Sequence, residues 1–334
     1  MLKKLTLIAL MVMVALVAAK HPHRYRESHY KEEFVKWMSH RNALYSSVDF
    51  HDKYENFKSN YDFIANWNDK QSSTILGLND FADLSNKEYR ETYLGTTYDV
   101  SDLEESTRLN QIFVGDVPNH LDWRVQGAVS HVKDQGRCGS CWSFSTVGAI
   151  EGSNFVKTGV MTTLSEQQLV DCSKTYGNHG CNGGLMEPSF QYVIDNGGLM
   201  TETNYPYTAT DKAACKFDAS KGPITTISAY NTTVRGSEDS LLQAVQLNPI
   251  AVAIDAGQRS FQLYKSGVYY DSNCSSYRLN HAVLLVGYGV EHTTNSPYWI
   301  VKNSWNTVWG NQGYIMMAKG SNHCGIASMA SYSI

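Results

Sequence analysis

Long hydrophobic runs are scarce in this sequence of 334 residues. The first nineteen residues hold one, because Lys3 and Lys4 precede an apolar stretch from Leu5 to Val17 that small residues follow. The stretch is shorter than the ~20 residues of a membrane helix. A basic start, an apolar middle and a small-residue end are typical of a secretory signal peptide. We therefore predict that residues 1–19 are a signal peptide and that the remaining chain, without a membrane anchor, reaches a lysosome or is secreted.

Basic clusters and regular metal-binding spacings are also absent. Lys and Arg together number 28 against 32 Asp and Glu, which gives a formal net charge of −4. No basic run stands out, so nucleic acid is not an expected partner. Apart from the pair Cys138 and Cys141 the cysteines stand singly, and no histidine pair has the spacing of a zinc site. We expect neither a metal nor any other cofactor.

The segment from about residue 21 to 115 contains no cysteine, one proline, and many charged and aromatic residues. Six of its residues, spaced three or four apart, would share one face of a helix, with Asp49 and Lys53 as an ion pair of ~0.3 kcal/mol. Asparagine is a poor helix former, so two asparagines on this face indicate hydrogen bonds to another segment. Spacing alone does not exclude an ordinary amphipathic helix. The six residues are Asp49, Lys53, Phe57, Asn60, Ile64 and Asn68.

A change in composition near Val117-Pro118 divides the chain. Residues 96–116 are polar, acidic and without periodicity, and we predict a linker there; glycine, cysteine and tryptophan become frequent afterwards. We therefore place one domain at residues 20–116 and a second at residues 117–334.

The second domain is predicted to be helical first and strand-rich afterwards. One helix should begin near Cys141 and end before Gly159, and a short one should cover residues 164–170, opened by Ser165. Short β-prone runs follow. Helices followed by strands indicate an α+β fold with a cleft where the halves meet. The predicted strands cover residues 250–254, 282–286, 298–301 and 314–317.

The cysteine count is odd, at seven. A secretory compartment favours disulfides, so at least one thiol is left over. Parity does not distinguish a buried spare thiol from a nucleophile. The seven are Cys138, Cys141, Cys172, Cys181, Cys215, Cys274 and Cys324.

The pair Cys138 and Cys141 admits three interpretations. A zinc site would need two further ligands at regular spacing. A thioredoxin-type dithiol has its tryptophan before the first cysteine, whereas Trp142 follows the second one here. In the third interpretation Cys141 is a nucleophile at a helix N-terminus, where the helix dipole stabilises a thiolate.

A nucleophilic Cys141 needs a base, a group that orients the base, and donors for an oxyanion. His281 opens the apolar run 282–286, and Asn303 follows the run 298–301 at a separation that suits two adjacent strands. The Asn303 amide oxygen could accept the imidazole N–H, and Trp305 could cover that bond. Gln135 could direct its side-chain N–H₂ towards the reacting carbon.

The stretch Gln135-Gly-Arg-Cys-Gly-Ser-Cys141-Trp142, with His281-Ala282-Val283 and Asn303-Ser304-Trp305, closely resembles the papain-like cysteine peptidases from residue 117 onwards. The resemblance implies a two-subdomain fold with a helical left half and a β-barrel-like right half. It makes Cys141 the nucleophile, His281 the general acid and base, and Asn303 the orienting group. Gln135 and the Cys141 N–H would form the oxyanion hole. The implied disulfides are Cys138–Cys181, Cys172–Cys215 and Cys274–Cys324.

The N-terminal domain resembles the inhibitory propeptide of cathepsin L-like zymogens. The six-residue helix face is similar to the ERFNIN motif, with Asp49 and Lys53 replacing its first two members, and a second pattern is similar to the GNFD motif. The resemblance implies that residues 20–116 lie along the cleft and detach in acid as their carboxylates protonate. The expected partners are protein and peptide substrates, the chain's own propeptide and cystatin-like inhibitors, and a monomer is expected. The GNFD-like residues are Gly77, Asn79, Phe81 and Asp83.

The resemblance also implies a substrate-binding surface. Gly183 and Gly184 would pair with an extended substrate backbone, because glycine allows close approach. The positions that line the main specificity pocket are all apolar, which predicts preference for a bulky apolar residue two positions before the scissile bond. The pocket residues are Leu185, Met186, Ala253, Leu279 and Met329, and Asn280 and Trp305 complete the expected substrate-binding set.

Other expectations concern single positions. Asn306 stands where the family usually has glycine, and asparagine is the least costly substitute at positive φ. Asn231-Thr232-Thr233 is a candidate glycosylation sequon, and Asn273-Cys274-Ser275 is a weaker one. Two alternatives to a peptidase stay open from the residues alone: a catalytically silent storage or binding protein, and a thiol oxidoreductase.

Overall fold

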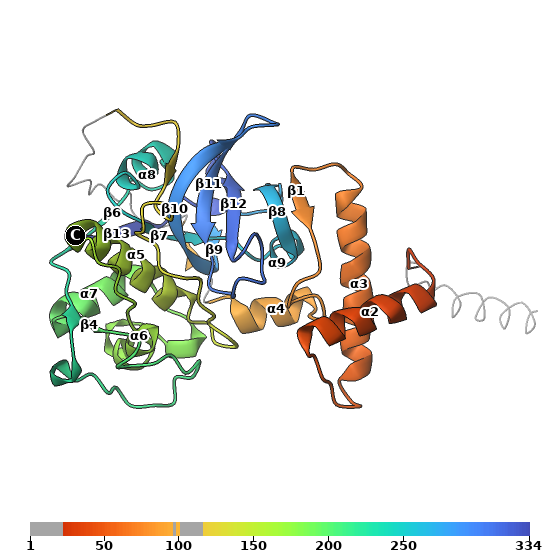
Figure 1. The fold of residues 1–334 in the computed structure, drawn as a ribbon, viewed down its shortest axis with the longest axis horizontal. Coiled ribbons are helices and arrows are strands. Elements are labelled where there is room, and N and C mark those ends of the chain that lie inside the picture. The colour runs from red at the N-terminus through yellow and green to blue at the C-terminus, as the bar shows by residue number, and fades with distance from the viewer. Residues whose placement is uncertain (1–22, 96–97, 101–115) are drawn as a thin grey trace, which may run out of the picture.

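Two apolar cores organise the chain, whose computed structural model describes residues 23–95, 98–100 and 116–334 (Figure 1). The predicted signal peptide and most of the predicted linker lie outside these residues. The smaller core joins two N-terminal helices, and the larger core fills the rest of the molecule. None of the described helices combines the length and apolar character needed to cross a bilayer.

The smaller core is mainly aromatic and lies where α2 (Glu27–Arg41) crosses α3 (Phe50–Asn68). The Phe34 ring is central, with its centroid 5.0 Å from that of Phe57 and 5.2 Å from that of Tyr54. Tilted aromatic pairs at such distances stabilise beyond their buried area. The helix predicted from the three- and four-residue spacing is therefore present and packs through this face.

The prediction that Asp49 and Lys53 form an ion pair is wrong. The Lys53 ammonium lies 2.8 Å from Glu88, and Asp49 accepts a hydrogen bond from Ser46 at 2.6 Å. Glu88 belongs to the capping box that begins α4 (Asn86–Tyr93), so its carboxylate is already fixed in place. Lys53 consequently ties α3 to α4 and does not stabilise α3 alone.

In the second domain, α5 (Cys141–Thr158) runs through the helical half and is buried along most of its length. Gly152 permits this packing, because a Cβ there would lie 2.6 Å from the Pro249 ring. The helix ends where predicted, at Gly159, which has a φ of +74°.

Two shorter helices lie beside α5. The first, α6 (Glu166–Cys172), begins after Ser165 as predicted, because the Ser165 hydroxyl accepts the Gln168 N–H at 3.0 Å. The second, α7 (Met186–Asn196), was not predicted from the sequence.

The strand-rich half is a nine-stranded sheet that contains all four predicted strands. Its path runs from β1 to β6, with β3 paired to β10 beside it, so the described strands form an open sheet. The β-barrel-like half that the resemblance implied is therefore not a closed barrel. Along the path, the strands are β1 (Thr74–Leu76), β8 (Tyr264–Tyr269), β12 (Tyr314–Ala318), β11 (Ser296–Lys302), β10 (His281–Glu291), β7 (Ile250–Ile254), β13 (Ala330–Ser333) and β6 (Tyr230–Thr232), with β3 at Leu121–Asp122.

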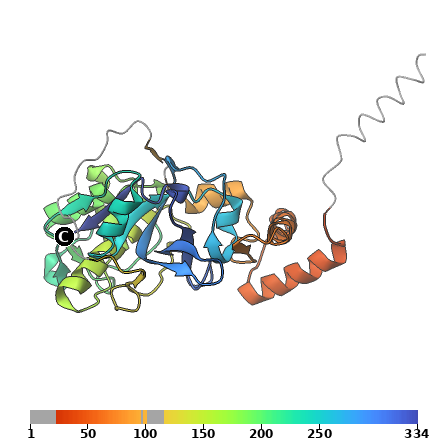
Figure 2. The ribbon, with the colours of Figure 1, turned by 90° about the horizontal axis from the view of Figure 1, so that it is seen from above.

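The N-terminal domain extends this sheet and then crosses the second domain. Strand β1 pairs with β8 at one edge, and α4 runs beneath the sheet in the view of Figure 1. Figure 2 shows α2 and α3 lying outside the second domain, on the side of β1. Further along, β2 (Tyr98–Asp99) pairs with β9 (Arg278–Leu279). The linker prediction is thus wrong at its start, where the chain forms a strand.

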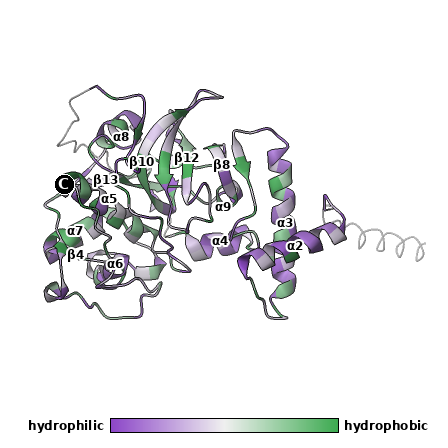
Figure 3. Ribbon diagram, viewed as in Figure 1, coloured by the Kyte–Doolittle hydropathy of each residue, from purple (hydrophilic) through white to green (hydrophobic). Residues whose placement is uncertain are grey.

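The remaining elements are short. Figure 3 shows hydrophobic residues concentrated on the strands of the sheet, whereas α4 is mainly hydrophilic. The other strands and helices are β4 (Leu199–Met200), β5 (Ile224–Thr225), α8 (Glu238–Ala244) and α9 (Arg259–Gln262), with 3₁₀ turns at Lys174–Tyr176, Gly180–Asn182, Ala219–Lys221 and His323–Gly325.

Candidate active site

The odd cysteine is Cys141, the first residue of α5. The other six form three disulfides, and these join the pairs that the resemblance implied. The bond between Cys138 and Cys181 fastens the loop before α5 to the turn that carries Gly183 and Gly184. The two cysteines of the CxxC therefore have different roles, one structural and one available for chemistry.

His281 and Asn303 meet across two adjacent strands. His281 begins β10, Asn303 follows β11, and the two strands pair antiparallel. His281 Nε2 lies 2.8 Å from Asn303 Oδ1. The Trp305 ring stacks on the imidazole with centroids 4.5 Å apart, so it covers this hydrogen bond as expected.

In this closed state burial disfavours the charged forms of both the thiol and the imidazole. Burial raises the pKa of Cys141, against the effect of backbone N–H groups such as that of Ala282, which lies 3.4 Å from Sγ. Burial also lowers the pKa of His281 to about 4, although the hydrogen bond to Asn303 favours the protonated form. A thiolate–imidazolium pair therefore requires water to enter the site.

Gln135 is held by hydrogen bonds at both ends of its side-chain amide. Its Oε1 accepts hydrogen bonds from Ser304 Oγ at 2.7 Å and from Trp305 Nε1 at 3.0 Å. Its Nε2 donates to the carbonyl oxygens of Cys138 at 2.8 Å and Tyr93 at 3.0 Å. Sequence reasoning missed Ser304 as a partner of Gln135, because a serine hydroxyl gives no distinctive signal in a sequence.

The N-terminal domain covers the nucleophile. The Gly95 N–H donates to the Asn280 carbonyl oxygen at 2.9 Å, and a Cβ on Gly95 would lie 3.4 Å from Cys141 Sγ. The Tyr93 carbonyl meanwhile occupies the Nε2 donor of Gln135. Both Cys141 and the candidate oxyanion donor are thus blocked by the same short segment.

An apolar pocket adjoins the nucleophile, and Gly95 and Tyr98 of the N-terminal domain also line it. Most of the expected pocket residues are here, but Met329 does not line it; its carbonyl oxygen accepts the Ala253 N–H instead. Asn280 contributes its main chain, because its side chain bonds to Ala256 and Asp255. The other lining residues are Cys141, Gly184, Leu185, Met186, Ala253, Leu279, Asn280, His281 and Ala282.

Gly184 fits its position because it has no side chain. A Cβ there would lie 2.6 Å from the Trp142 ring and from Asn178 Oδ1. Gly183 adopts a φ of +114°, which favours glycine. Asn306 has a φ of +59°, the left-handed conformation for which asparagine is the least costly replacement of glycine. Trp305 keeps its stacking on His281 despite this substitution.

The two sequons differ in exposure. Asn231 lies in β6 opposite Tyr332, is only 6% exposed, and its Nδ2 is buried. A glycan on Asn231 would require this edge of the sheet to open. Asn273 is exposed, on the loop before β9.

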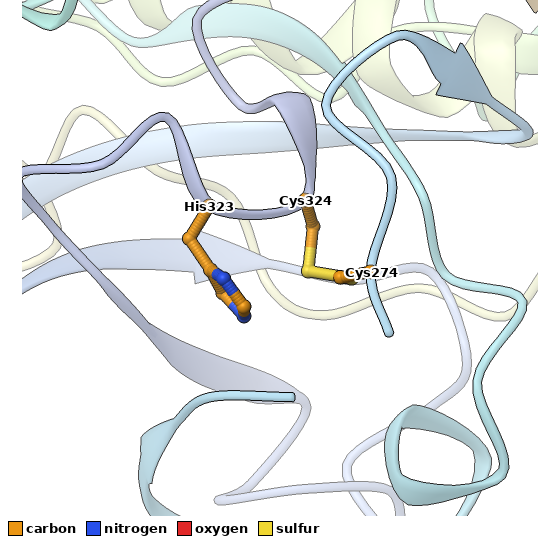
Figure 4. Close-up of side chains that lie close together, drawn as sticks. All are labelled: Cys274, His323 and Cys324. Atoms are coloured by element: carbon orange, nitrogen blue, oxygen red, sulfur yellow. A yellow bond between two sulfur atoms is a disulfide. The ribbon is translucent and has the colours of Figure 1, made fainter. Parts of the chain in front are cut away.

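One group of side chains has the composition of a metal site. Potential ligand atoms of Cys274, His323 and Cys324 lie within 4.8 Å of one another. Figure 4 shows, however, that the two sulfur atoms are bonded to each other, with His323 beside them. Disulfide sulfurs are not thiolate ligands, and His323 Nε2 accepts the Asp271 N–H at 3.2 Å. We therefore do not assign a metal site here.

Comparison with known proteins agrees with this geometry. Residues 117–334 match the family described as papain family cysteine protease, and residues 34–89 match the cathepsin propeptide inhibitor domain (I29). Cysteine proteinase 5 of Dictyostelium discoideum is 45% identical over 341 residues, which is 97% of each chain. The probable cysteine protease RD21B of Arabidopsis thaliana is 48% identical over 307 residues, 90% of this chain and 64% of that protein.

Solved proforms have the same fold. The proform of the ragweed pollen allergen Amb a 11 superposes with a TM-score of 0.83 at 35% identity, covering 94% of this chain and 99% of that one. The digestive procathepsin L 3 of Tenebrio molitor gives 0.80 at 39% identity, covering 91% and 98%.

Proposed function

The chain belongs to the papain family of cysteine proteases, and we propose that it cleaves peptide bonds by attack of the Cys141 thiolate, with His281 as acid and base. It is a cysteine endopeptidase made as a zymogen, and its N-terminal domain is its own inhibitor. The observation that carries the residue assignment is the hydrogen bond of His281 to Asn303, at 2.8 Å, beside the chain's one unpaired cysteine.

The proposed reaction starts once the cleft is open to water. The Cys141 proton moves to His281, and the sulfur attacks the carbonyl carbon of the substrate. The resulting oxyanion accepts hydrogen bonds from the Cys141 N–H and Gln135 Nε2. The imidazolium then gives its proton to the leaving amine as the C–N bond breaks, which leaves a thioester.

Hydrolysis of the thioester reverses these roles. A water molecule gives a proton to His281 and attacks the thioester carbon, and the C–S bond breaks to release the acid and the thiolate. Asn303 holds the imidazole ring in place during both steps through its 2.8 Å hydrogen bond. Trp305 keeps that bond away from water.

This assignment is tested by labelling the acid-activated protein with an epoxide inhibitor of cysteine peptidases. We expect one label per molecule, on Cys141, and none after a Cys141→Ser change. A Cys138→Ser variant separates a peptidase from a thiol oxidoreductase. It should keep the labelling while losing a disulfide worth ~2–5 kcal/mol of stability. Labelling of another residue would overturn the assignment.

We also infer a preference for a bulky apolar residue two positions before the scissile bond. The pocket beside Cys141 is walled by Leu185, Met186, Ala253 and Leu279 and has no Asp, Glu, Lys or Arg among its lining residues. An arginine placed there would lose its hydration without an ionic partner. Fluorogenic peptides that vary only at this position test the inference. Leu and Phe should give the highest kcat/KM, and equal cleavage after Arg would contradict it.

Not every carboxylate of the N-terminal domain favours opening of the zymogen in acid. Burial raises the pKa of Asp83, so protonating it in acid favours the closed state. Glu88 acts in the opposite direction: burial opposes its ionisation, but Lys53 and Ser85 lower its pKa overall. Stability that the N-terminal domain gains from ionised Glu88 is lost as the pH falls below the ordinary Glu pKa of 4.5.

The remaining proposals concern the setting of the enzyme. The signal-like residues 1–19 support passage to a lysosome or to the medium, and fractionation of cells that express the full chain would distinguish these destinations from a cytosolic location. We further propose a monomer that cystatin-like inhibitors can bind. Gel filtration, and titration of the activated enzyme with a cystatin, test these two proposals separately.

A further inference from the structure

A tyrosine outside the catalytic set bridges the two residues that flank the oxyanion site. Tyr207 Oη donates to the Gln135 carbonyl oxygen at 2.8 Å, and it lies 2.6 Å from Ser140 Oγ. A phenol has one proton, and the Gln135 carbonyl takes it, so the Ser140 hydroxyl must donate to Tyr207. One hydroxyl group therefore fixes two points of the loop that precedes α5.

These two points carry the proposed oxyanion donors. Gln135 supplies its side-chain Nε2, and Ser140 forms the peptide bond that contains the Cys141 N–H. The loop between them contains no helix or strand, so no backbone ladder sets its shape. Its conformation depends on the Cys138–Cys181 disulfide and on hydrogen bonds of this kind.

Two other groups of Gln135, its N–H and its Oε1, bind residues from across the cleft. Its N–H donates to the Ser304 carbonyl oxygen at 2.9 Å, and its Oε1 accepts from Ser304 and Trp305. Tyr207 provides an anchor from the helical half. Gln135 is thus held from both sides of the cleft, which fixes the position of its amide relative to Cys141.

Tyr207 is itself held firmly. Its ring lies edge-on to that of Phe144 of α5, with centroids 4.9 Å apart and planes at 79°. Its N–H donates to Glu202 Oε1 at 2.8 Å. The phenol oxygen is therefore fixed relative to α5, whose first residue is the nucleophile.

We propose that Tyr207 is a positioning residue of the oxyanion hole, which it holds through the Gln135 carbonyl and the Ser140 hydroxyl. This inference rests on the proposed roles of Gln135 and Cys141. Oxyanion donors act on the transition state more than on the bound substrate. Loss of the Tyr207 hydroxyl therefore lowers kcat, by roughly tenfold, and leaves KM nearly unchanged; removing a donor outright costs ~100-fold or more.

The experiment compares Tyr207→Phe with a matched control on the same half of the molecule. Tyr205 Oη also makes two hydrogen bonds, with Asp171 at 2.7 Å and with the Lys216 N–H at 3.1 Å, but none to the loop before α5. Each full-length variant is activated in acid, its active sites are titrated with an epoxide inhibitor, and kcat and KM are measured per active site. We expect the tenfold loss of kcat in Tyr207→Phe and wild-type values in Tyr205→Phe.

Measuring Tyr207→Phe in a Gln135→Ala background separates a loss of positioning from a general loss of structure. In Gln135→Ala the main oxyanion donor is missing, so Tyr207→Phe should cost threefold or less there. Ser140→Ala removes the other hydrogen bond and should lower kcat in the same direction, which keeps the test available if Tyr207→Phe folds poorly. An unchanged kcat, a rise in KM alone, or equal losses with and without Gln135 would overturn the inference. A wild-type enzyme that neither cleaves peptides nor labels at Cys141 would instead defeat the proposed function.

Discussion

Burial of His281 predicts that acid opens the zymogen. The closed state lowers the pKa of His281 from 6.5 to about 4 by excluding water from the imidazole. A solvated imidazole in the open cleft binds a proton near its ordinary pKa of ~6.5. Between these two values the open state binds more protons than the closed state. Closure is therefore fully favoured above pH 6.5 and weakens as the pH falls towards 4.

The size of this effect on closure follows from the shift in the pKa of His281. The full difference between the two states corresponds to roughly 3 kcal/mol, of which about 2 kcal/mol is expressed at pH 5. The population of open molecules should therefore rise about 20-fold between pH 7 and pH 5 from this group alone. Asp83 works in the opposite direction, and the stability that Glu88 gives to the N-terminal domain weakens only below pH 4.5.

Amide hydrogen exchange in full-length Cys141→Ser protein, which cannot process itself, measures this opening. The Gly95 N–H, bonded to the Asn280 carbonyl oxygen, should exchange about 20-fold faster at pH 5 than at pH 7, after correction for intrinsic exchange rates. The Ala253 N–H, bonded within the second domain to Met329, serves as the control and should not change. A further His281→Gln change should flatten the response. Protection of Gly95 that is equal at both pH values would refute the reasoning.

Three substitutions test other parts of the structure. Asn60→Ala removes a buried hydrogen bond of 2.8 Å to the Ala82 carbonyl oxygen and should destabilise the inhibitor domain by ~1–3 kcal/mol. The chain should therefore self-process at a higher pH, and an unchanged pH midpoint of self-processing would contradict this. Glu151→Gln removes one of the two carboxylates that pair with buried Lys133, while Glu166 stays 2.5 Å from it, and should lower the free energy of unfolding of the mature enzyme by ~1–3 kcal/mol in denaturant titrations; an unchanged free energy would show that the Glu151 charge is not needed. Gly184→Ala places a Cβ 2.6 Å from the Trp142 ring and should cost ~1–3 kcal/mol in the same assay, together with most of the activity; wild-type behaviour would contradict the packing.

Much of the fold was predictable because its signals are local. The start of α5 at Cys141, its end at Gly159 and the cap at Ser165 each depend on a few neighbouring residues. Four strands of the sheet were predicted individually, but the order of the strands was not. The parallel contact of β12 with β8 joins segments that no spacing rule connects.

Within the site, residue types were easier to predict than contacts. His281 and Asn303 could be proposed together because adjacent antiparallel strands bring such positions close. The hydroxyl of Ser304, the N–H of Ala282 and the phenol of Tyr207 gave no comparable signal, since backbone groups and hydroxyls occur everywhere. Met329 was expected in the pocket from the resemblance alone, and it is not among the residues that line the pocket in the closed state.

Buried polar groups without hydrogen-bond partners in the closed site favour its opening. His281 Nδ1 and Asn303 Nδ2 are buried without hydrogen-bond partners among the described residues, and each such group costs ~1–3 kcal/mol. When water enters, the imidazole becomes able to hold a proton opposite the thiolate, and both nitrogens regain partners. The inhibitor domain must therefore outweigh this cost through contacts with the second domain outside the site, such as β1 on β8 and the hydrogen bond of Arg259 to Asn60. Weakening those distant contacts should open the zymogen without any change at Cys141, because the site itself favours the open state.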